Sequence, residues 1–172
     1  VRSPRFNADI FRERRQFDKA LEMYQISLDR LDIALQKLPN KANELKQGIS
    51  IYQIRKALML GKTSKNAEAK QLIEKAYGNY LADVEKNKDD SSKVLFFYEA
   101  LPDVAEYFVD SNQLPKAIEV WENHAKRVQY FLDKNPDDGG FWNYLADANK
   151  RIGDTYAGYD EKSKSYKIKD KA

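Results

Sequence analysis

Residues 16–28 read Gln-Phe-Asp-Lys-Ala-Leu-Glu-Met-Tyr-Gln-Ile-Ser-Leu, and residues 113–125 read Gln-Leu-Pro-Lys-Ala-Ile-Glu-Val-Trp-Glu-Asn-His-Ala. Each stretch places an alanine one turn before a large aromatic residue, within a stripe of apolar residues along one face of a helix. The alanines are Ala20 and Ala117, and Ala69 lies between them in a similar stripe. They follow one another at spacings of 49 and 48. This regularity predicts an internal repeat.

A second feature upstream of the alanines keeps the same period. A small residue followed three positions later by a large apolar one recurs at spacings of 49, 48 and 48, in the pairs Ala8/Phe11, Ala57/Leu60, Ala105/Phe108 and Gly153/Tyr156. Because two separate features share one period, we expect a repeated pair of helices with a period of about 48. About three and a half copies fit in the chain.

The composition agrees with long amphipathic helices. The 172 residues include only 7 glycines and 5 prolines but 33% charged residues, 11 tyrosines and 8 phenylalanines. Few turn-forming residues argue against a β-sandwich or barrel, and the aromatic content argues against disorder. The chain has no cysteine and a single histidine, His124. This excludes disulfides, cysteine-bound zinc, iron–sulfur clusters and multi-histidine metal sites.

Helix limits follow from the residues that interrupt helices. Pro39 ends one helix, Gly61 is expected as the left-handed cap of the next, and Pro102 should kink or split a third near Leu101. The expected helices cover residues 17–38, 42–60, 66–86, 92–110, 115–134 and 141–156. Residues 1–157 then form the helical domain, and residues 158–172 are a charged tail expected to be frayed or disordered.

These residues resemble a known family. Phe17-Asp18-Lys19-Ala20-Leu21-x-x-Tyr24 is similar to the turn and second helix of a tetratricopeptide (TPR) repeat, and Leu101-x-x-Val104-Ala105-x-x-Phe108 is similar to a first helix. The resemblance implies an all-α, right-handed solenoid of antiparallel hairpins whose concave face binds peptides or partner helices. The period here exceeds that of the family, which is roughly 34 residues, so the helices should be longer. Similar repeats also accompany bacterial signalling kinases.

Charge is distributed unevenly along the chain. The net charge is +3, but residues 97–145 contain nine acidic and four basic residues, a net of −5. No concentrated basic stripe is present, so nucleic acid is not an expected partner. The run Arg12, Arg14, Arg15 should form a solvated face or pair with the acidic third unit of a neighbouring molecule. Uncapped terminal repeats would also favour a homodimer.

Targeting features are few. No apolar run approaches the 18 or so residues of a transmembrane helix, so membrane insertion is not expected. The opening Val1-Arg2-Ser3-Pro4-Arg5 lacks the apolar region of a signal peptide. The abrupt start predicts a fragment of a longer protein, with the cytoplasm favoured as its location.

No catalytic or cofactor motif can be identified. His124 has no nucleophile and carboxylate arranged around it in the sequence, and a structural or surface role is expected. The pairs Asp89-Asp90 and Asp137-Asp138 lack calcium-loop spacing and should be solvated carboxylates or helix N-caps. No phosphate-binding glycine loop occurs. In the run Phe96-Phe97-Tyr98, two rings should fill the core and one should point outward.

The resemblance implies where a binding groove would lie. On TPR geometry its inward residues are Arg5, Asp9 and Arg12 in the first unit, Glu99 and Glu106 in the third, and Asp147, Lys150 and Asp154 in the fourth. The first hypothesis is therefore a non-catalytic interaction domain, without cofactor or metal, that binds a protein or peptide within a larger bacterial regulatory protein.

The alternative is a sensor of a small molecule or short peptide that controls an attached effector such as a kinase. A sensor should have an enclosed apolar pocket of roughly 300 Å³ or more, lined by Tyr52, Tyr77, Tyr80 or Phe97, whereas an interaction domain should have an open charged groove. An enzyme is the third and least favoured class.

Overall fold

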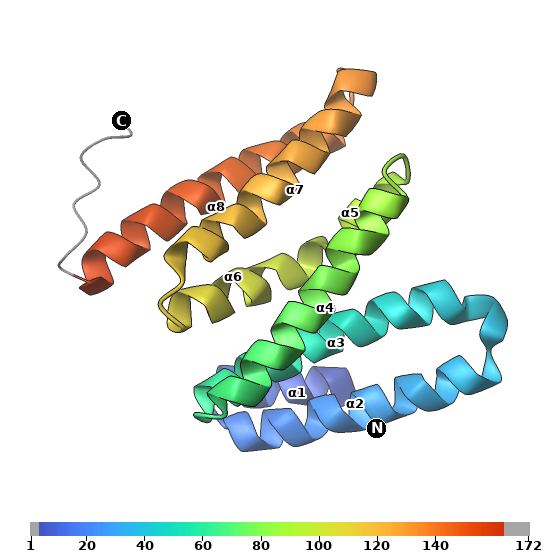
Figure 1. Ribbon diagram of the computed structural model, residues 1–172, viewed down its shortest axis with the longest axis vertical. Coiled ribbons are helices and arrows are strands. Elements are labelled where there is room, and N and C mark those ends of the chain that lie inside the picture. The colour runs from blue at the N-terminus through green and yellow to red at the C-terminus, as the bar shows by residue number, and fades with distance from the viewer. Residues whose placement is uncertain (1–3, 164–172) are drawn as a thin grey trace.

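The computed structural model describes the backbone of residues 4–163 and the side chains of residues 7–157. Within that part of the chain the fold is all-helical, with no strand (Figure 1). Two short 3-10 helices, η1 (Pro39–Lys41) and η2 (Tyr98–Ala100), connect longer ones. The α-helices are α1 (Pro4–Glu13), α2 (Phe17–Lys37), α3 (Ala42–Lys62), α4 (Asn66–Lys86), α5 (Ser91–Phe97), α6 (Leu101–Asp110), α7 (Leu114–Lys134) and α8 (Gly139–Ser163).

Most helix limits agree with the sequence within two residues, and the largest differences are at α8. This helix begins at Gly139 and continues to Ser163, beyond the expected end at Tyr156. No proline follows Tyr156, so nothing in the local sequence forces the helix to stop there. The expected tail therefore begins within α8, and residues 164–172 lie outside the described residues.

The split expected at Pro102 is confirmed. A single run of helical pattern over residues 91–110 is divided into α5 and α6 by the 3-10 turn η2, and Pro102 sits in the first turn of α6. Proline cannot donate the backbone hydrogen bond that a continuous helix would need there, but it is well tolerated in a first turn. On either side of the break, α5 packs against α4, α7 and α3, while α6 packs mainly against α7 and also against α3.

Three turns between helices share one geometry. Arg15, Ser64 and Asn112 all have positive φ, at 56°, 64° and 58°, and they recur at the spacings of 49 and 48 seen in the sequence. In each turn the residue after the positive-φ residue donates its backbone N–H to a carbonyl five positions earlier in the chain. These hydrogen bonds are 2.8–2.9 Å long and include Gln16 to Phe11 and Lys65 to Leu60. This is the Schellman ending of a helix.

The sequence-based assignment of Gly61 as a left-handed cap is wrong. Gly61 lies within α3, no described glycine has positive φ, and the left-handed residue is Ser64. Near Gly61 the ring of Tyr107 packs closely, so that a Cβ added there would lie 3.6 Å from it. The glycine contributes to the contact of α3 with α6 rather than to a turn.

The repeated alanines lie in the core. Ala20, Ala69 and Ala117 are fully buried, as are the upstream Ala8 and Ala57. An alanine at a helix contact lets two backbones approach closely, and neighbouring rings such as Tyr24 and Trp121 fill the space around it. The fourth small residue, Gly153, is exposed, since no described helix packs on that side of α8.

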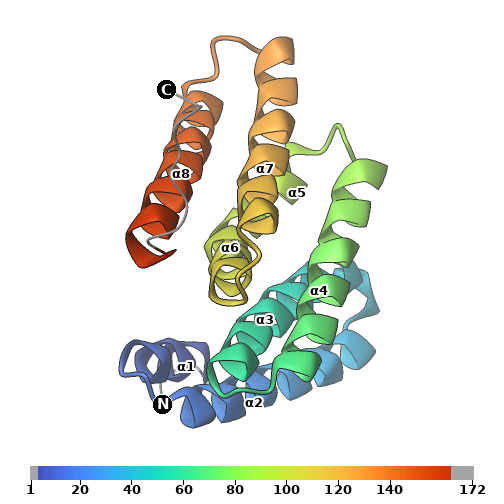
Figure 2. The ribbon, with the colours of Figure 1, turned by 60° about the vertical axis from the view of Figure 1, so that its left-hand side comes forward.

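The helices stack in chain order from α1 and α2 at one end to α7 and α8 at the other (Figures 1 and 2). Each helix packs mainly on its neighbours in sequence, and α6 also packs on α3. Side chains of α1 also reach α6, through ion pairs from Arg12. The stack therefore brings the first, second and third pairs of helices together at one side-chain cluster.

Candidate functional site

The side chains that join α1, α3 and α6 form an ion-pair network around Asp103. This carboxylate is 4% exposed and pairs with Arg12 at 2.5 Å and with Arg55 at 3.3 Å. Burial on its own would lower the pKa of Arg12, but the carboxylates of Asp103 and Glu106 raise it above its ordinary value. Arg12 therefore stays charged, and the shared carboxylate of Asp103 lies between the two guanidinium groups.

The groove residues expected on the first and third units are largely engaged in this network. Arg12 and Glu106 bind each other at 2.9 Å, and Glu106 also pairs with Lys62 at 2.9 Å. Glu99 lies 3.8 Å from Arg55, and the carboxylate of Asp9 accepts a hydrogen bond from the Tyr24 hydroxyl. Arg5 lies in α1, but its side chain is outside the described residues.

The expected groove residues of the fourth unit lie together on α8. Asp147 accepts hydrogen bonds from the Tyr98 hydroxyl and from Arg151, and Lys150 pairs with Asp154 at 3.6 Å. Burial and the Asp147 charge raise the pKa of Tyr98 to about 12. Asp154 also lines a pocket of about 440 Å³ with Lys62 and Glu106, so the structure brings expected groove residues of the third and fourth units to one pocket.

The arginine run finds its acidic partner within the same chain. Arg12 pairs with Asp103 and Glu106 of the acidic third quarter, whereas Arg14 and Arg15 are exposed. The expected solvated face is found for Arg14 and Arg15, and the alternative of pairing with the acidic third unit holds for Arg12, but within one chain rather than between molecules. The close approach of α1 to α6 in the stack supplies the contact internally.

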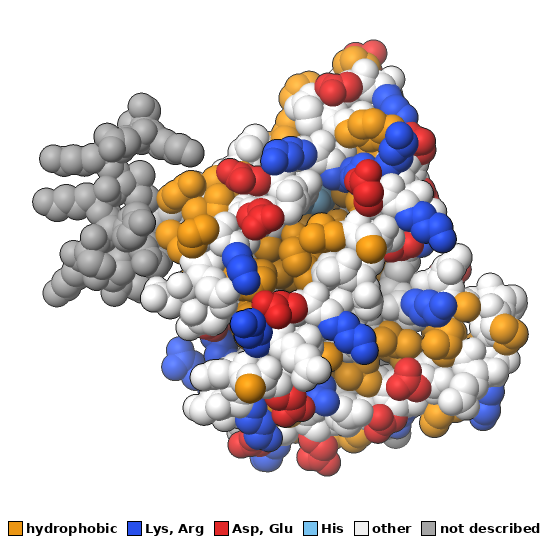
Figure 3. Space-filling model, viewed as in Figure 1, with side chains coloured by type: hydrophobic (Ala, Val, Ile, Leu, Met, Phe, Trp, Pro, Cys, Tyr) orange, Lys and Arg blue, Asp and Glu red, His pale blue; other side chains and the backbone are white. Residues whose placement is uncertain are grey.

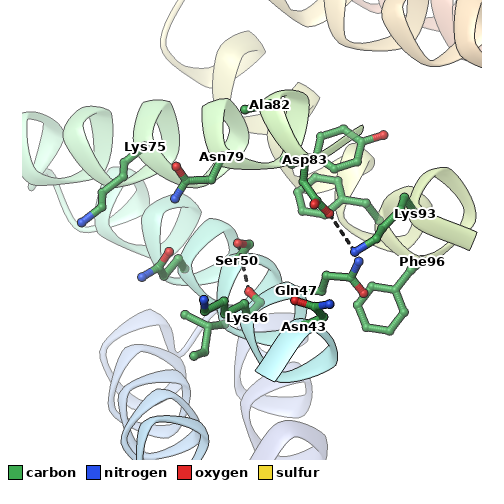
Figure 4. A pocket seen from close by; sticks show the side chains of 14 residues that line it. Asn43, Lys46, Gln47, Ser50, Lys75, Asn79, Ala82, Asp83, Lys93 and Phe96 are labelled. Carbon is green, nitrogen blue, oxygen red and sulfur yellow. Dashed lines mark hydrogen bonds and ion pairs between the residues drawn. The ribbon is translucent and has the colours of Figure 1, made fainter. Parts of the chain in front are cut away.

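A half-open pocket of about 370 Å³ lies between α3, α4 and α5 (Figure 4). Its apolar wall includes Tyr80 and Phe97, whose rings stack at 3.8 Å between centroids. Its polar lining is rich in amides and lysines, contributed by Asn43, Lys46, Gln47, Ser50, Gln53, Lys75, Asn79 and Lys93. Polar side chains recur along α3 at helical spacing and face the amide of Asn79 on α4 (Figure 4).

The pocket between α3, α4 and α5 carries positive charge that the fold does not neutralise. Lys93 pairs with Asp83 at 3.0 Å, but Lys46 and Lys75 are exposed and pair with no acidic side chain among the described residues. The lining therefore has three lysines against one carboxylate.

Phe96 lies at the edge with 45% of its surface exposed, and Phe97 is buried. The expectation that one ring of residues 96–98 points outward is confirmed.

Another pocket, of about 520 Å³, lies between α4 and α7. It appears as a hollow with apolar side chains in the surface (Figure 3). Tyr77 and Tyr80 line it from α4, and His124 and Tyr130 line it from α7. His124 is 2% exposed and neither ring nitrogen has a hydrogen-bond partner. Burial lowers its pKa to about 4, although the charge of Asp147 acts in the opposite direction.

Three of the four side chains named by the sensor hypothesis line a pocket, but both pockets are half open rather than enclosed. Tyr77 and Tyr80 line the pocket between α4 and α7, Tyr80 and Phe97 line the one between α3, α4 and α5, and Tyr52 lines neither. The amides Asn43 and Gln47 were missed. Their signal was available, because polar residues at i and i+4 mark a solvent-facing stripe on a helix.

The paired aspartates act as the sequence indicated. Asp90 accepts the backbone N–H of Ser92 at 3.0 Å, and Asp138 accepts that of Gly140 at 2.9 Å, so both cap helix N-termini. Across the described residues, no three histidine or acidic side chains are grouped so that they could hold a metal ion. None of the helices described is long and apolar enough to span a bilayer.

Comparison of the chain with family models, with curated proteins and with solved structures found no match. The geometry above is therefore the basis for a functional assignment.

Proposed function

We propose that the chain is a TPR-like interaction domain, a right-handed solenoid of about three and a half helix pairs with a period of about 48. The three Schellman turns at Arg15, Ser64 and Asn112 support the repeat, because one backbone geometry recurs at the period of the sequence pattern. A unit of two helices cannot bury its apolar stripe alone, so units of this kind stack.

The proposed role is non-catalytic binding of an acidic peptide segment of a protein partner, within a larger bacterial regulatory protein. The observation that carries this proposal is the lining of the pocket between α3, α4 and α5. Lys46 and Lys75 lack acidic partners among the described residues, and Phe96 is exposed at the end of the same pocket away from Lys75 (Figure 4). An exposed aromatic residue and unpaired charges that line one pocket are typical of a binding surface.

The chemistry of the pocket favours an extended acidic peptide. Its amides, among them Asn43, Gln47 and Asn79, can each donate to and accept from peptide groups. Its lysines attract carboxylates and speed the encounter with them. Phe96 offers an apolar surface for one side chain of the peptide. The internal pairing of Arg12, Glu99 and Glu106 makes this pocket a better candidate than the groove expected from TPR geometry.

The test is fluorescence anisotropy with a short labelled peptide that contains glutamates and phenylalanines. We expect saturable binding that weakens as salt rises from about 50 to 500 mM, because salt screens exposed charges. Reversal of two charges in Lys46→Glu with Lys75→Glu should weaken binding at least about tenfold. Phe96→Ala should weaken it by about tenfold through the lost apolar contact.

The matched control is Lys37→Glu, an equally exposed lysine near the end of α2 that lines none of the pockets described above. Its affinity should stay within about twofold of the wild type. Equal binding by the double variant and the wild type would show that the pocket is not the docking site. A peptide with lysines in place of its glutamates should not bind.

Self-association through uncapped ends is also part of the proposal. Among the described helices α8 packs mainly on α7, with Tyr144 also against Tyr98 of η2, so a second copy could cover the outer face of α8. Sedimentation velocity over a range of protein concentration distinguishes a monomer from such a homodimer.

A further inference from the structure

The pocket between α4 and α7 contains two buried polar side chains that the fold leaves without partners. Both ring nitrogens of His124 and the hydroxyl of Tyr77 are buried and make no hydrogen bond. The amide of Asn123 lies near the Tyr77 hydroxyl but not in hydrogen-bonding geometry. The two side chains come from different helices and line one pocket of about 520 Å³. We propose that this pocket binds a small, uncharged, planar molecule whose edge both donates and accepts hydrogen bonds.

The unpartnered groups call for an explanation because such groups are rare in native proteins. A buried donor or acceptor without a partner costs free energy relative to its hydrated state in the unfolded chain. His124 is surrounded by aromatic rings rather than by acceptors, with Tyr98 at 5.1 Å and Tyr144 at 6.4 Å between centroids. Asp147, the nearby carboxylate, is engaged by Tyr98 and Arg151. A ligand is therefore the missing partner.

The lining defines the chemistry of the ligand. A neutral imidazole presents one N–H donor and one nitrogen acceptor, and a tyrosine hydroxyl can do either. The inner wall is apolar, formed by Val84, Leu101 and Val120. A charged ligand would lose hydration there without gaining an opposite charge on the imidazole. A carboxamide or a heteroaromatic edge satisfies both requirements.

The rim of the pocket carries three charged side chains. Arg127 pairs with Glu85 at 3.0 Å, and Lys126 is exposed to solvent, where water and salt screen its charge. Tyr130 lines the same side, with its hydroxyl donating to Asp89 and with Lys134 4.4 Å from the centre of its ring. The pocket volume is within the range of small-molecule sites. Each nitrogen of His124 has under 1 Å² exposed, so binding requires side chains of the wall to shift.

The site shares Tyr80 with the proposed peptide pocket, but it is tested separately through His124 and Tyr77, which line only this pocket of the two. His124 is the only histidine of the chain, so its ring signals in a two-dimensional NMR spectrum are unambiguous. The probe is nicotinamide, which is neutral and planar, and the control is nicotinate, which has the same ring and a negative charge. We expect saturable shifts of the His124 signals with a Kd of about 1 mM for nicotinamide. Nicotinate should bind at least about tenfold more weakly.

Two variants separate a binding role from a structural one. His124→Phe and Tyr77→Phe remove the polar atoms and keep a ring of similar size, and they are read by ligand-observed saturation transfer. Each variant should weaken nicotinamide binding at least about threefold. Neither should lower the Tm of the ligand-free protein, because the polar group that it removes has no hydrogen-bond partner in the fold.

Three results would overturn the proposal. Shifts that fail to saturate below about 20 mM would show that the pocket holds water only. Equal binding of nicotinate would contradict the uncharged specificity. Unchanged binding by both variants would place the ligand elsewhere.

Discussion

Removal of the Asp103 carboxylate should destabilise the fold more than any other single charge deletion on α6. Asp103 is 4% exposed and lies between Arg12 and Arg55, at 2.5 and 3.3 Å. Asp103→Ala leaves two guanidinium groups without their shared partner, and Arg55 is itself buried. An uncompensated buried charge has few ways to relax.

The magnitude follows from what each arginine retains. Breaking a fully buried ion pair by removing one partner costs about 3–5 kcal/mol. The side chain of Arg12 is 28% exposed and keeps Glu106 at 2.9 Å, while Arg55 keeps Glu99 at 3.8 Å. These contacts place the loss of unfolding free energy near the low end, at about 3 kcal/mol. For a chain of this size that lowers Tm by about 6–12 °C.

The assay is urea unfolding followed by circular dichroism at 222 nm, at neutral pH. The matched control is Asp110→Ala, which removes the same group from the same helix. Asp110 is 38% exposed and pairs with Lys62, which also binds Glu106. A surface pair of this kind contributes about 0–1 kcal/mol.

The double variant Arg55→Met with Asp103→Leu tests the mechanism. It removes both buried charges, so it should be at least about 1 kcal/mol more stable than Asp103→Ala. If Asp103→Ala loses no more stability than Asp110→Ala, the carboxylate does not hold α1, α3 and α6 together, and the reasoning fails.

Four further variants test other features of the fold. Burial lowers the pKa of His124 from 6.5 to about 4, so below pH 6.5 the unfolded chain binds a proton that the folded chain does not. Between pH 7 and pH 4 the free energy of unfolding should therefore fall by about 3 kcal/mol more for the wild type than for His124→Phe. Urea unfolding at the two pH values measures this difference. Ser64→Gly should raise the free energy of unfolding by about 0.5 kcal/mol, because glycine adopts positive φ without steric cost. Asn112→Gly should raise it less, because asparagine already tolerates that conformation. A lower Tm for Ser64→Gly in a thermal melt would contradict the turn geometry. Gly78→Ala should raise the free energy of unfolding by about 1 kcal/mol, because alanine favours the helix and its Cβ would meet no atom within 4 Å. A lower free energy of unfolding would reveal an unrecognised contact.

The helices could be predicted from the sequence because their limits depend on local chemistry. Pro39 and Pro102 interrupt helical hydrogen bonding wherever they occur, and η1 and η2 lie at both positions. The error at Gly61 arose because a glycine near a helix end was taken as its cap. The left-handed position is instead occupied by Ser64, and neither Ser64 nor Arg15 belongs to a residue type that marks this conformation.

The charged network could be predicted only in part, because its pairs join distant segments. The opposite charges of the arginine run and the acidic third quarter are evident from composition, but composition does not say whether they meet within one molecule. That depends on the stacking of α6 on α3, which brings Asp103 to Arg12 and Arg55. Likewise the sequence shows that His124 is a lone histidine, whereas its lack of a partner appears only once Tyr98 and Asp147 are placed.

The shared wall of the two pockets determines which variants can distinguish their functions. Tyr80 lines both pockets and its ring stacks on Phe97 at 3.8 Å, so Tyr80→Ala would open both pockets at once and leave a cavity in the core. A loss of binding in that variant would not identify the site responsible. Lys75 lines only the pocket between α3, α4 and α5, and His124 lines only the one between α4 and α7. Substitutions at these two positions therefore assign a bound partner to one pocket or the other.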